Sequence, residues 1–123
     1  MPKTENRDKG LAGEELAAGM LEKKGYRVLH RNWRCKLGEI DIIATDGGAI
    51  VFIEVKARGS AAYGQPQEAV TIFKQRQIIK AALSYIKSRG LTSRDIRFDV
   101  VSVCGQEVEL IRNAFQSEGR YRY

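Results

Sequence analysis

The stretch GEIDIIATDGGAIVFIEVKAR constrains the fold more than any other part of the chain. Its two β-branched runs, 39–45 and 49–57, are typical of buried strands, and the DGG between them is typical of a hairpin turn. Ionised side chains are costly in buried strands unless they are paired or bind something. Asp41, Glu54 and Lys56 therefore belong either to a structural ion pair or to a functional site.

The length of the turn decides which charged side chains of this hairpin face one another. With a two-residue glycine loop, paired residue numbers sum to 95, so Asp41 lies opposite Glu54 and Glu39 lies opposite Lys56. Side chains alternate between faces along a strand and directly opposite residues share a face, so all four share one face. A three-residue loop would shift the register by one residue and send Asp41 to the other face.

Two directly opposed carboxylates repel each other, and a divalent cation removes this repulsion. We expect Asp41 and Glu54 to supply oxygen ligands to Mg²⁺ or Mn²⁺, with waters and a substrate phosphate completing the coordination. Lys56 would lie beside the metal, where it can position a water and offset charge on the phosphate. Glu14, at the edge of the buried stripe of the first helix, is the further candidate ligand. This catalytic set predicts metal-assisted phosphodiester hydrolysis, and an ion-paired hairpin without chemistry is the alternative.

The net charge of +6 is unevenly distributed along the chain. Residues 23–36 carry six cations and no carboxylate, and residues 39–54 carry four carboxylates and no cation. Residues 56–94 carry eight cations against the single Glu68. A basic surface attracts polyanions such as nucleic acid, whereas a solvated basic surface is the alternative interpretation.

Within the second basic tract, several residues are candidates for contacting nucleic acid. Lys74, Arg76 and Lys80 belong to the first turns of a predicted helix, where the helix dipole disfavours cations and phosphate contacts would explain them. Arg58 and Tyr63 belong to a small-residue loop beside the proposed site, and the tyrosine ring is suited to contacting substrate bases.

No repeat, low-complexity tract or linker divides the sequence, so we expect one domain over residues 1–123, with a polar N-terminal arm and a C-terminal tail. Its elements alternate in a way that is typical of an α/β fold with a mixed sheet flanked by helices. The predicted order is a helix at 8–24, strands at 26–34, 39–45 and 49–57, a helix at 71–89, and strands at 96–103 and 107–111.

Composition narrows the class of protein. With 43% hydrophobic and 29% charged residues the chain is an ordinary globular sequence, and no apolar run is long enough to span a membrane. The polar start MPKTENRDKG is not a secretory signal. Cys35 and Cys104 fit no metal motif and are interpreted as reduced thiols, so we expect a cytoplasmic protein without a membrane partner.

Several motifs together resemble known families. GEID followed by EVK looks like the PD-(D/E)xK motif of restriction-endonuclease-like nucleases, and GEELAAGMLEKKGYRVLHRNWR is similar to archaeal Holliday junction resolvases. Nearly the whole chain, with a core at about 9–112, resembles the YraN-like family, through GYRVLHRNWR, GEIDIIATD, FIEVKAR, EAVTIFKQRQI and RFDVVSV. The resemblance implies a restriction-endonuclease-like core in which the metal and catalytic positions are Glu14, Asp41, Glu54 and Lys56. Ile40 stands where the motif has its eponymous proline.

These observations favour a metal-dependent nuclease that hydrolyses DNA, and the resemblance extends this to branched, Holliday-junction-like DNA. Symmetric cutting of a junction would need two sites, so a homodimer is implied as well. Two alternatives stay open: a nucleic-acid-binding module of the same fold without catalysis, and a basic domain that binds an acidic protein. Salt dependence separates the last of these, because phosphate contacts weaken steeply with salt.

Overall fold

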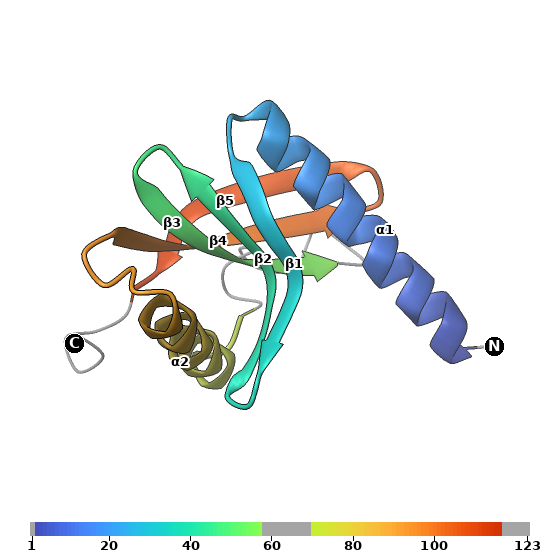
Figure 1. The fold of residues 1–123 in the computed structure, drawn as a ribbon. Coiled ribbons are helices and arrows are strands. Elements are labelled where there is room, and N and C mark those ends of the chain that lie inside the picture. Colours follow the sequence, from blue (N-terminus) through green and yellow to red (C-terminus); the bar gives the residue numbers. More distant parts are fainter. Residues whose placement is uncertain (1, 58–69, 117–123) are drawn as a thin grey trace.

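The computed structural model describes residues 2–57 and 70–116, with side chains described from residue 12 onward. The predicted order of elements, α-β-β-β-α-β-β, is confirmed (Figure 1). The elements are α1 (Pro2–Lys23), β1 (Arg27–Cys35), β2 (Gly38–Asp46), β3 (Ala49–Ala57), α2 (Ile72–Ser88), β4 (Asp95–Cys104) and β5 (Glu107–Phe115).

The five strands form one mixed sheet in the order β1-β2-β3-β4-β5. Three neighbouring pairs are antiparallel, and β3 pairs with β4 in parallel. A parallel pair needs a crossover connection, and α2 lies between these two strands in the chain. The fold class predicted from the sequence, a mixed sheet flanked by helices, is therefore the observed one.

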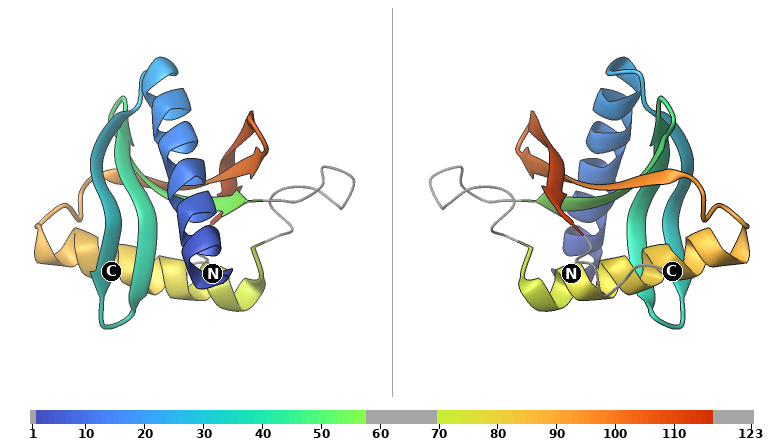
Figure 2. Two further views of the ribbon diagram at one scale, coloured as in Figure 1. Left: turned by 90° about the vertical axis from the view of Figure 1, so that its right-hand side faces the viewer. Right: turned by 90° about the vertical axis from the view of Figure 1, so that its left-hand side faces the viewer.

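The sheet separates two hydrophobic cores, one under each helix (Figure 2). On one face, Ile50 and Phe52 of β3 pack with Ile78 and its buried neighbours on α2. On the other face, the alternate β3 residues pack with Ala17 and Leu21 of α1. The continuous apolar run of β3 follows from this arrangement, because a strand covered on both faces buries every side chain.

The local signals at the ends of the elements also match the structure. Thr71 caps α2, because its side-chain oxygen accepts a hydrogen bond from the backbone N–H of Lys74 at 3.1 Å. Gly25, with φ at +95°, follows the end of α1 in the left-handed region that glycine adopts freely. Two boundaries differ from the prediction by more than one residue: α1 begins at Pro2, and β5 continues to Phe115.

The extension of β5 has a tertiary cause. The β4–β5 register shifts between Phe98 and Val100, and Asn113 adopts a left-handed conformation with φ at +53°. The shift brings Phe115 opposite Phe98, and the two rings stack with their centroids 5.1 Å apart. Since no local periodicity encodes this contact, the sequence pattern ended the strand too early.

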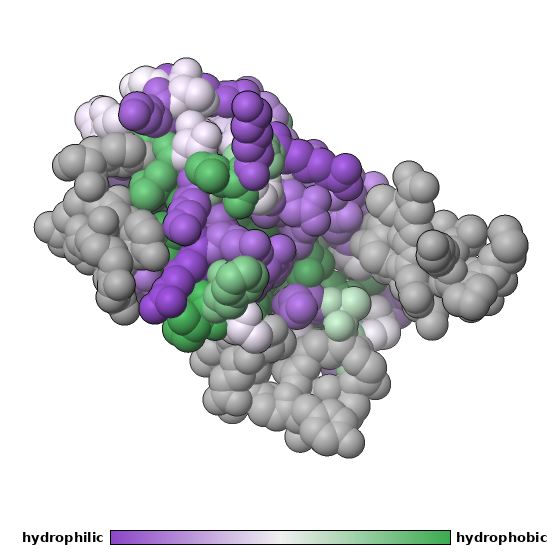
Figure 3. Space-filling model, turned by 90° about the horizontal axis from the view of Figure 1, so that it is seen from below, coloured by the Kyte–Doolittle hydropathy of each residue, from purple (hydrophilic) through white to green (hydrophobic). Residues whose placement is uncertain are grey.

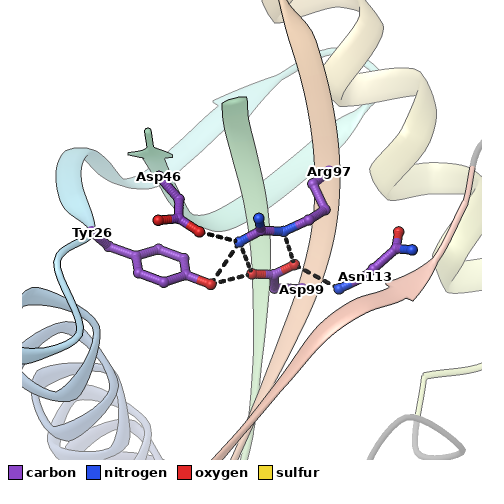
Figure 4. A network of polar contacts seen from close by, with 5 residues as sticks. All are labelled: Tyr26, Asp46, Arg97, Asp99 and Asn113. Atoms are coloured by element: carbon purple, nitrogen blue, oxygen red, sulfur yellow. Dashed lines mark hydrogen bonds and ion pairs between the residues drawn. The ribbon is translucent and has the colours of Figure 1, made fainter. Parts of the chain in front are cut away.

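A closed polar network joins the residue before β1 to strands β2, β4 and β5 (Figure 4). The buried Asp99 carboxylate accepts hydrogen bonds from the Tyr26 hydroxyl at 2.7 Å and the Asn113 N–H at 2.9 Å. Arg97 donates to both oxygens of Asp99 at 2.9 Å and to Asp46 at 2.9 Å. Burial and the Asp99 carboxylate raise the pKa of Tyr26 to about 12, so its hydroxyl stays a donor at neutral pH.

Two expectations from composition can be compared with the structure. Within residues 2–57 and 70–116, no helix has the length and apolar character of a membrane span. Cys35 and Cys104 are both free thiols.

Candidate functional site

The site lies where β2 separates from β3. The ladder between them runs from the Asp46–Ala49 pair to the Ile42–Ile53 pair, so residue numbers sum to 95 as predicted for the glycine turn. It does not continue to the predicted Asp41–Glu54 and Glu39–Lys56 pairs, and that part of the prediction is wrong. Glu39 instead pairs with Arg34 across the β1–β2 ladder, at 3.1 Å.

A twist in the β1–β2 hairpin explains the separation. Ile40 and Ile42 are two residues apart, yet they belong to the cores on opposite faces of the sheet. In β1, Asn32 adopts a left-handed conformation with φ at +54° at the same level. The turn-proximal half of the β1–β2 hairpin therefore leaves the plane of the sheet, and Asp41 lies at the point of departure.

The carboxylate of Asp41 occupies the gap that this twist leaves. Its Oδ2 accepts a hydrogen bond from the backbone N–H of Val55 at 2.8 Å, a donor beyond the end of the ladder. The Asp41 carboxylate also acts on the side chain of Glu54 and raises the pKa of that carboxyl.

Glu54 is the buried carboxyl of this pair. Its side chain is 7% exposed, and burial, followed by the neighbouring Asp41, raises its pKa to about 8. Lys74 and Lys56 act in the opposite direction. A buried carboxyl that is protonated at neutral pH is a strongly perturbed group, and such groups concentrate at functional sites.

The two lysines reach the site from different elements. The Lys74 ammonium, at the start of α2, lies 3.8 Å from Oε2 of Glu54. Lys56 is half-buried on β3, two residues beyond Glu54, and its charge acts on that carboxyl. Lys74 therefore lies in the site, rather than on the outer surface of α2 with the exposed Arg76 and Lys80.

Glu14 faces the site from α1. Its Oε1 atom is buried without a hydrogen-bond partner in the described part of the chain. Burial and then the negative charge of Asp41 raise the pKa of Glu14, whereas Arg31 and a hydrogen bond with Asn32 lower it. An unsatisfied buried oxygen is costly, so this atom is poised to accept a hydrogen bond or a metal contact.

The donor set can be compared with the requirements of a divalent cation. Among the described residues, no three His, Cys, Asp or Glu side chains stand close enough to share one ion. Mg²⁺ needs only one or two carboxylates when waters and substrate phosphate fill the other positions. Asp41 and Glu54 meet this requirement, and the unpartnered oxygen of Glu14 fits the role of holding a metal-bound water.

One residue of the site was not predicted from the sequence, and two predicted residues lie outside the described part of the chain. Asn32 was not predicted, although asparagine is enriched in the left-handed conformation that it adopts here. Arg58 and Tyr63, predicted to contact nucleic acid, lie outside the described residues.

Comparisons with known proteins identify the family of this chain. The family described as "Uncharacterised protein family UPF0102" matches residues 13–103. A UPF0102 protein of Geobacter sulfurreducens is 48% identical over 90% of this chain and 91% of its own length. One from Syntrophus aciditrophicus is 50% identical over 92% of both chains, and one from Geobacter metallireducens is 51% identical over 90% of this chain and 94% of its own. With the YraN-like motifs, this similarity shows that the chain belongs to the UPF0102 family.

Proposed function

We propose that this chain is a Mg²⁺- or Mn²⁺-dependent nuclease that hydrolyses phosphodiester bonds in DNA. The observation that carries the proposal is the pair of carboxyl groups at the end of the β2–β3 ladder, where Asp41 accepts a hydrogen bond from the Val55 N–H and acts on the buried Glu54. A stable core has no need of such a pair, because burying it raises the pKa of Glu54 at a cost in folding free energy.

Each residue of the site has a role in this proposal. Asp41 and Glu54 hold the cation, which when bound supplies Lewis acidity and a water of lowered pKa. Lys56 donates a hydrogen bond to the phosphate or to the attacking water and offsets the negative charge that develops in the transition state. The free oxygen of Glu14 accepts a hydrogen bond from a water and orients it.

The basic surface supports DNA as the substrate. Arg76 and Lys80 are exposed on α2, the helix whose Lys74 reaches Glu54, and we assign them to phosphate contacts. Branched DNA as the preferred substrate, a homodimer that supplies two sites, and action in the cytoplasm extend the proposal.

A second candidate is a nucleic-acid-binding module of the same fold without hydrolytic activity. The observation in its favour is the Lys74 ammonium, 3.8 Å from Glu54, which partly neutralises the carboxyl pair without a metal. The two candidates differ in metal binding and cleavage, so one series of measurements separates them.

The test is a calorimetric titration with Mn²⁺ at pH 8, comparing the wild type with Asp41→Asn and Glu54→Gln. We expect binding by the wild type and none by either variant, followed by Mn²⁺-dependent cleavage of branched or linear DNA by the wild type alone. Arg34→Ala, which alters only an exposed ion pair with Glu39, is the matched control and should bind Mn²⁺ as the wild type does. Absence of Mn²⁺ binding by the wild type, even with DNA present, would favour the binding module.

A further inference from the structure

Exposed apolar side chains gather at the start of α2. Of the described large hydrophobic residues, four are exposed: Leu29, Leu37, Ile72 and Phe73. Phe73 is 72% exposed and Ile72 is 59% exposed, the two highest values. Leu37 precedes Gly38, whose added Cβ would lie 3.8 Å from the Gln77 carbonyl oxygen, so the β1–β2 turn lies against the same part of α2.

Cations follow this apolar group along the helix. α2 carries four cations and no carboxylate. Phe73, Arg76, Lys80 and Lys87 are spaced by three, four and seven residues, which places them along one helix face, and all four are exposed. We call these four residues the outer row. In the described part of the chain, none of its cations pairs with a carboxylate.

The outer row begins next to the candidate site. Lys74, the neighbour of Phe73, reaches Glu54, so the exposed ring lies within one helical turn of the residue that contacts the carboxyl pair. Figure 3 looks at the underside of the molecule in Figure 1 and shows hydrophobic surface interleaved with hydrophilic surface there. A nucleic-acid strand that followed the cations would therefore run toward the site.

We propose that the outer row of α2 binds a single-stranded segment of DNA, with an unpaired base stacked on Phe73. This deepens the proposed function, on which it rests, by naming the substrate class: DNA with unpaired nucleotides beside the bond to be cut. An aromatic ring beside a row of cations suits a single strand, because the ring stacks on a base while the cations follow the phosphates.

The positive charge of the outer row favours a nucleic-acid strand over a second copy of the chain. A second copy of the chain docked through the same face would bring two rows of like charge together, which is repulsive. A single strand supplies both the negative charge that the cations need and the flat apolar surface that Phe73 needs. α2 carries no carboxylate that would repel phosphate.

The test measures binding in EDTA, where hydrolysis is absent, with an oligonucleotide that carries the fluorescent base 2-aminopurine. We expect the wild type to bind the single strand more tightly than a duplex of equal length and to quench the fluorescence by stacking. Phe73→Ala should bind the single strand about tenfold more weakly, without quenching, and Phe73→Trp should restore both. Leu29→Ala, an exposed apolar residue outside α2, is the control and should behave as the wild type.

Three results would overturn the inference: unchanged affinity in Phe73→Ala, quenching that persists in it, or no preference for the single strand. A dimer in light scattering that dissociates in Phe73→Ala would overturn it too, because a second copy would then occupy the face. Failure of the proposed nuclease is a separate outcome. The wild type could bind the oligonucleotide in EDTA and quench its fluorescence but never cleave DNA with Mn²⁺. That result would support the stacking surface and contradict the proposed nuclease.

Discussion

Two buried carboxyl groups on neighbouring strands have opposite surroundings. Asp99 on β4 is level with Ile53 on β3, the residue directly before Glu54. The Asp99 carboxylate is fully buried and accepts four hydrogen bonds, two of them from Arg97 (Figure 4). Glu54 has one cation at 3.8 Å, and burial and the neighbouring Asp41 raise its pKa.

The difference separates structural polar groups from functional ones. A closed network satisfies its charges internally and has no capacity left for a ligand. The carboxyl groups of Glu14 and Glu54, by contrast, have raised pKa values, and one Glu14 oxygen has no hydrogen-bond partner in the described part of the chain. This arrangement lowers stability, and a bound cation would restore it. Substitutions in the two regions should therefore have opposite effects on stability.

The largest expected effect on stability comes from the closed network. Arg97→Met leaves the Asp99 carboxylate buried without its cation, and we expect the free energy of unfolding to fall by about 3–5 kcal/mol. Urea denaturation followed by circular dichroism measures this. Arg34→Ala, whose ion pair with Glu39 is exposed, should change the free energy of unfolding by less than about 1 kcal/mol. Equal effects of the two variants would show that the network is not closed in solution.

Lys56→Ala tests whether the candidate site around Glu54 catalyses cleavage. If Lys56 offsets charge in the transition state, the cleavage rate should fall by about 10²–10³-fold while Mn²⁺ and DNA binding change little. Single-turnover cleavage and calorimetry measure the two properties separately. Cleavage at the wild-type rate would remove Lys56 from the mechanism.

The raised pKa of Glu54 predicts that metal binding depends on pH. Because a cation must displace the proton of Glu54, Mn²⁺ affinity should rise by about tenfold per pH unit below pH 8 and level off above it. Calorimetry in two buffers of different ionisation enthalpy would detect the released proton at pH 7. An affinity that is constant from pH 6 to 8 would contradict the assignment of this proton.

Glu54→Gln gives the smallest predicted effect and the most direct contrast with Arg97→Met. The folded pKa of Glu54, about 8, lies above its unfolded value, so its protonated form stabilises the fold at low pH and this contribution is lost as the pH rises through 8. Glutamine keeps a neutral side chain at every pH. In EDTA we expect similar melting temperatures at pH 5, and at pH 9 a variant that melts about 4 °C or more above the wild type, roughly 1 kcal/mol.

The wild type should then gain more stability from Mn²⁺ than Glu54→Gln does, as thermal unfolding with and without the metal would show. A variant that is less stable than the wild type at pH 9 would place Glu54 among the structural carboxylates.

Much of the fold was predictable from local patterns. The DGG turn set the β2–β3 register, Thr71 marked the start of α2, and the apolar run of β3 predicted a buried strand. The same patterns predicted that Asp41 lies close to Glu54. They overextended the ladder to the Asp41–Glu54 and Glu39–Lys56 pairs, because a twist centred on one residue has no periodicity to reveal it.

The sequence by itself determined the order of elements, the register of the central hairpin and the carboxyl pair, since turn chemistry and side-chain alternation act over a few residues. Only the tertiary structure decided that Lys74 reaches Glu54, that Asn32 twists the hairpin and that Asp41 accepts a hydrogen bond from the Val55 N–H. Those contacts join segments far apart in the chain. Their geometry depends on how the sheet twists and where the helices pack, which no local pattern encodes.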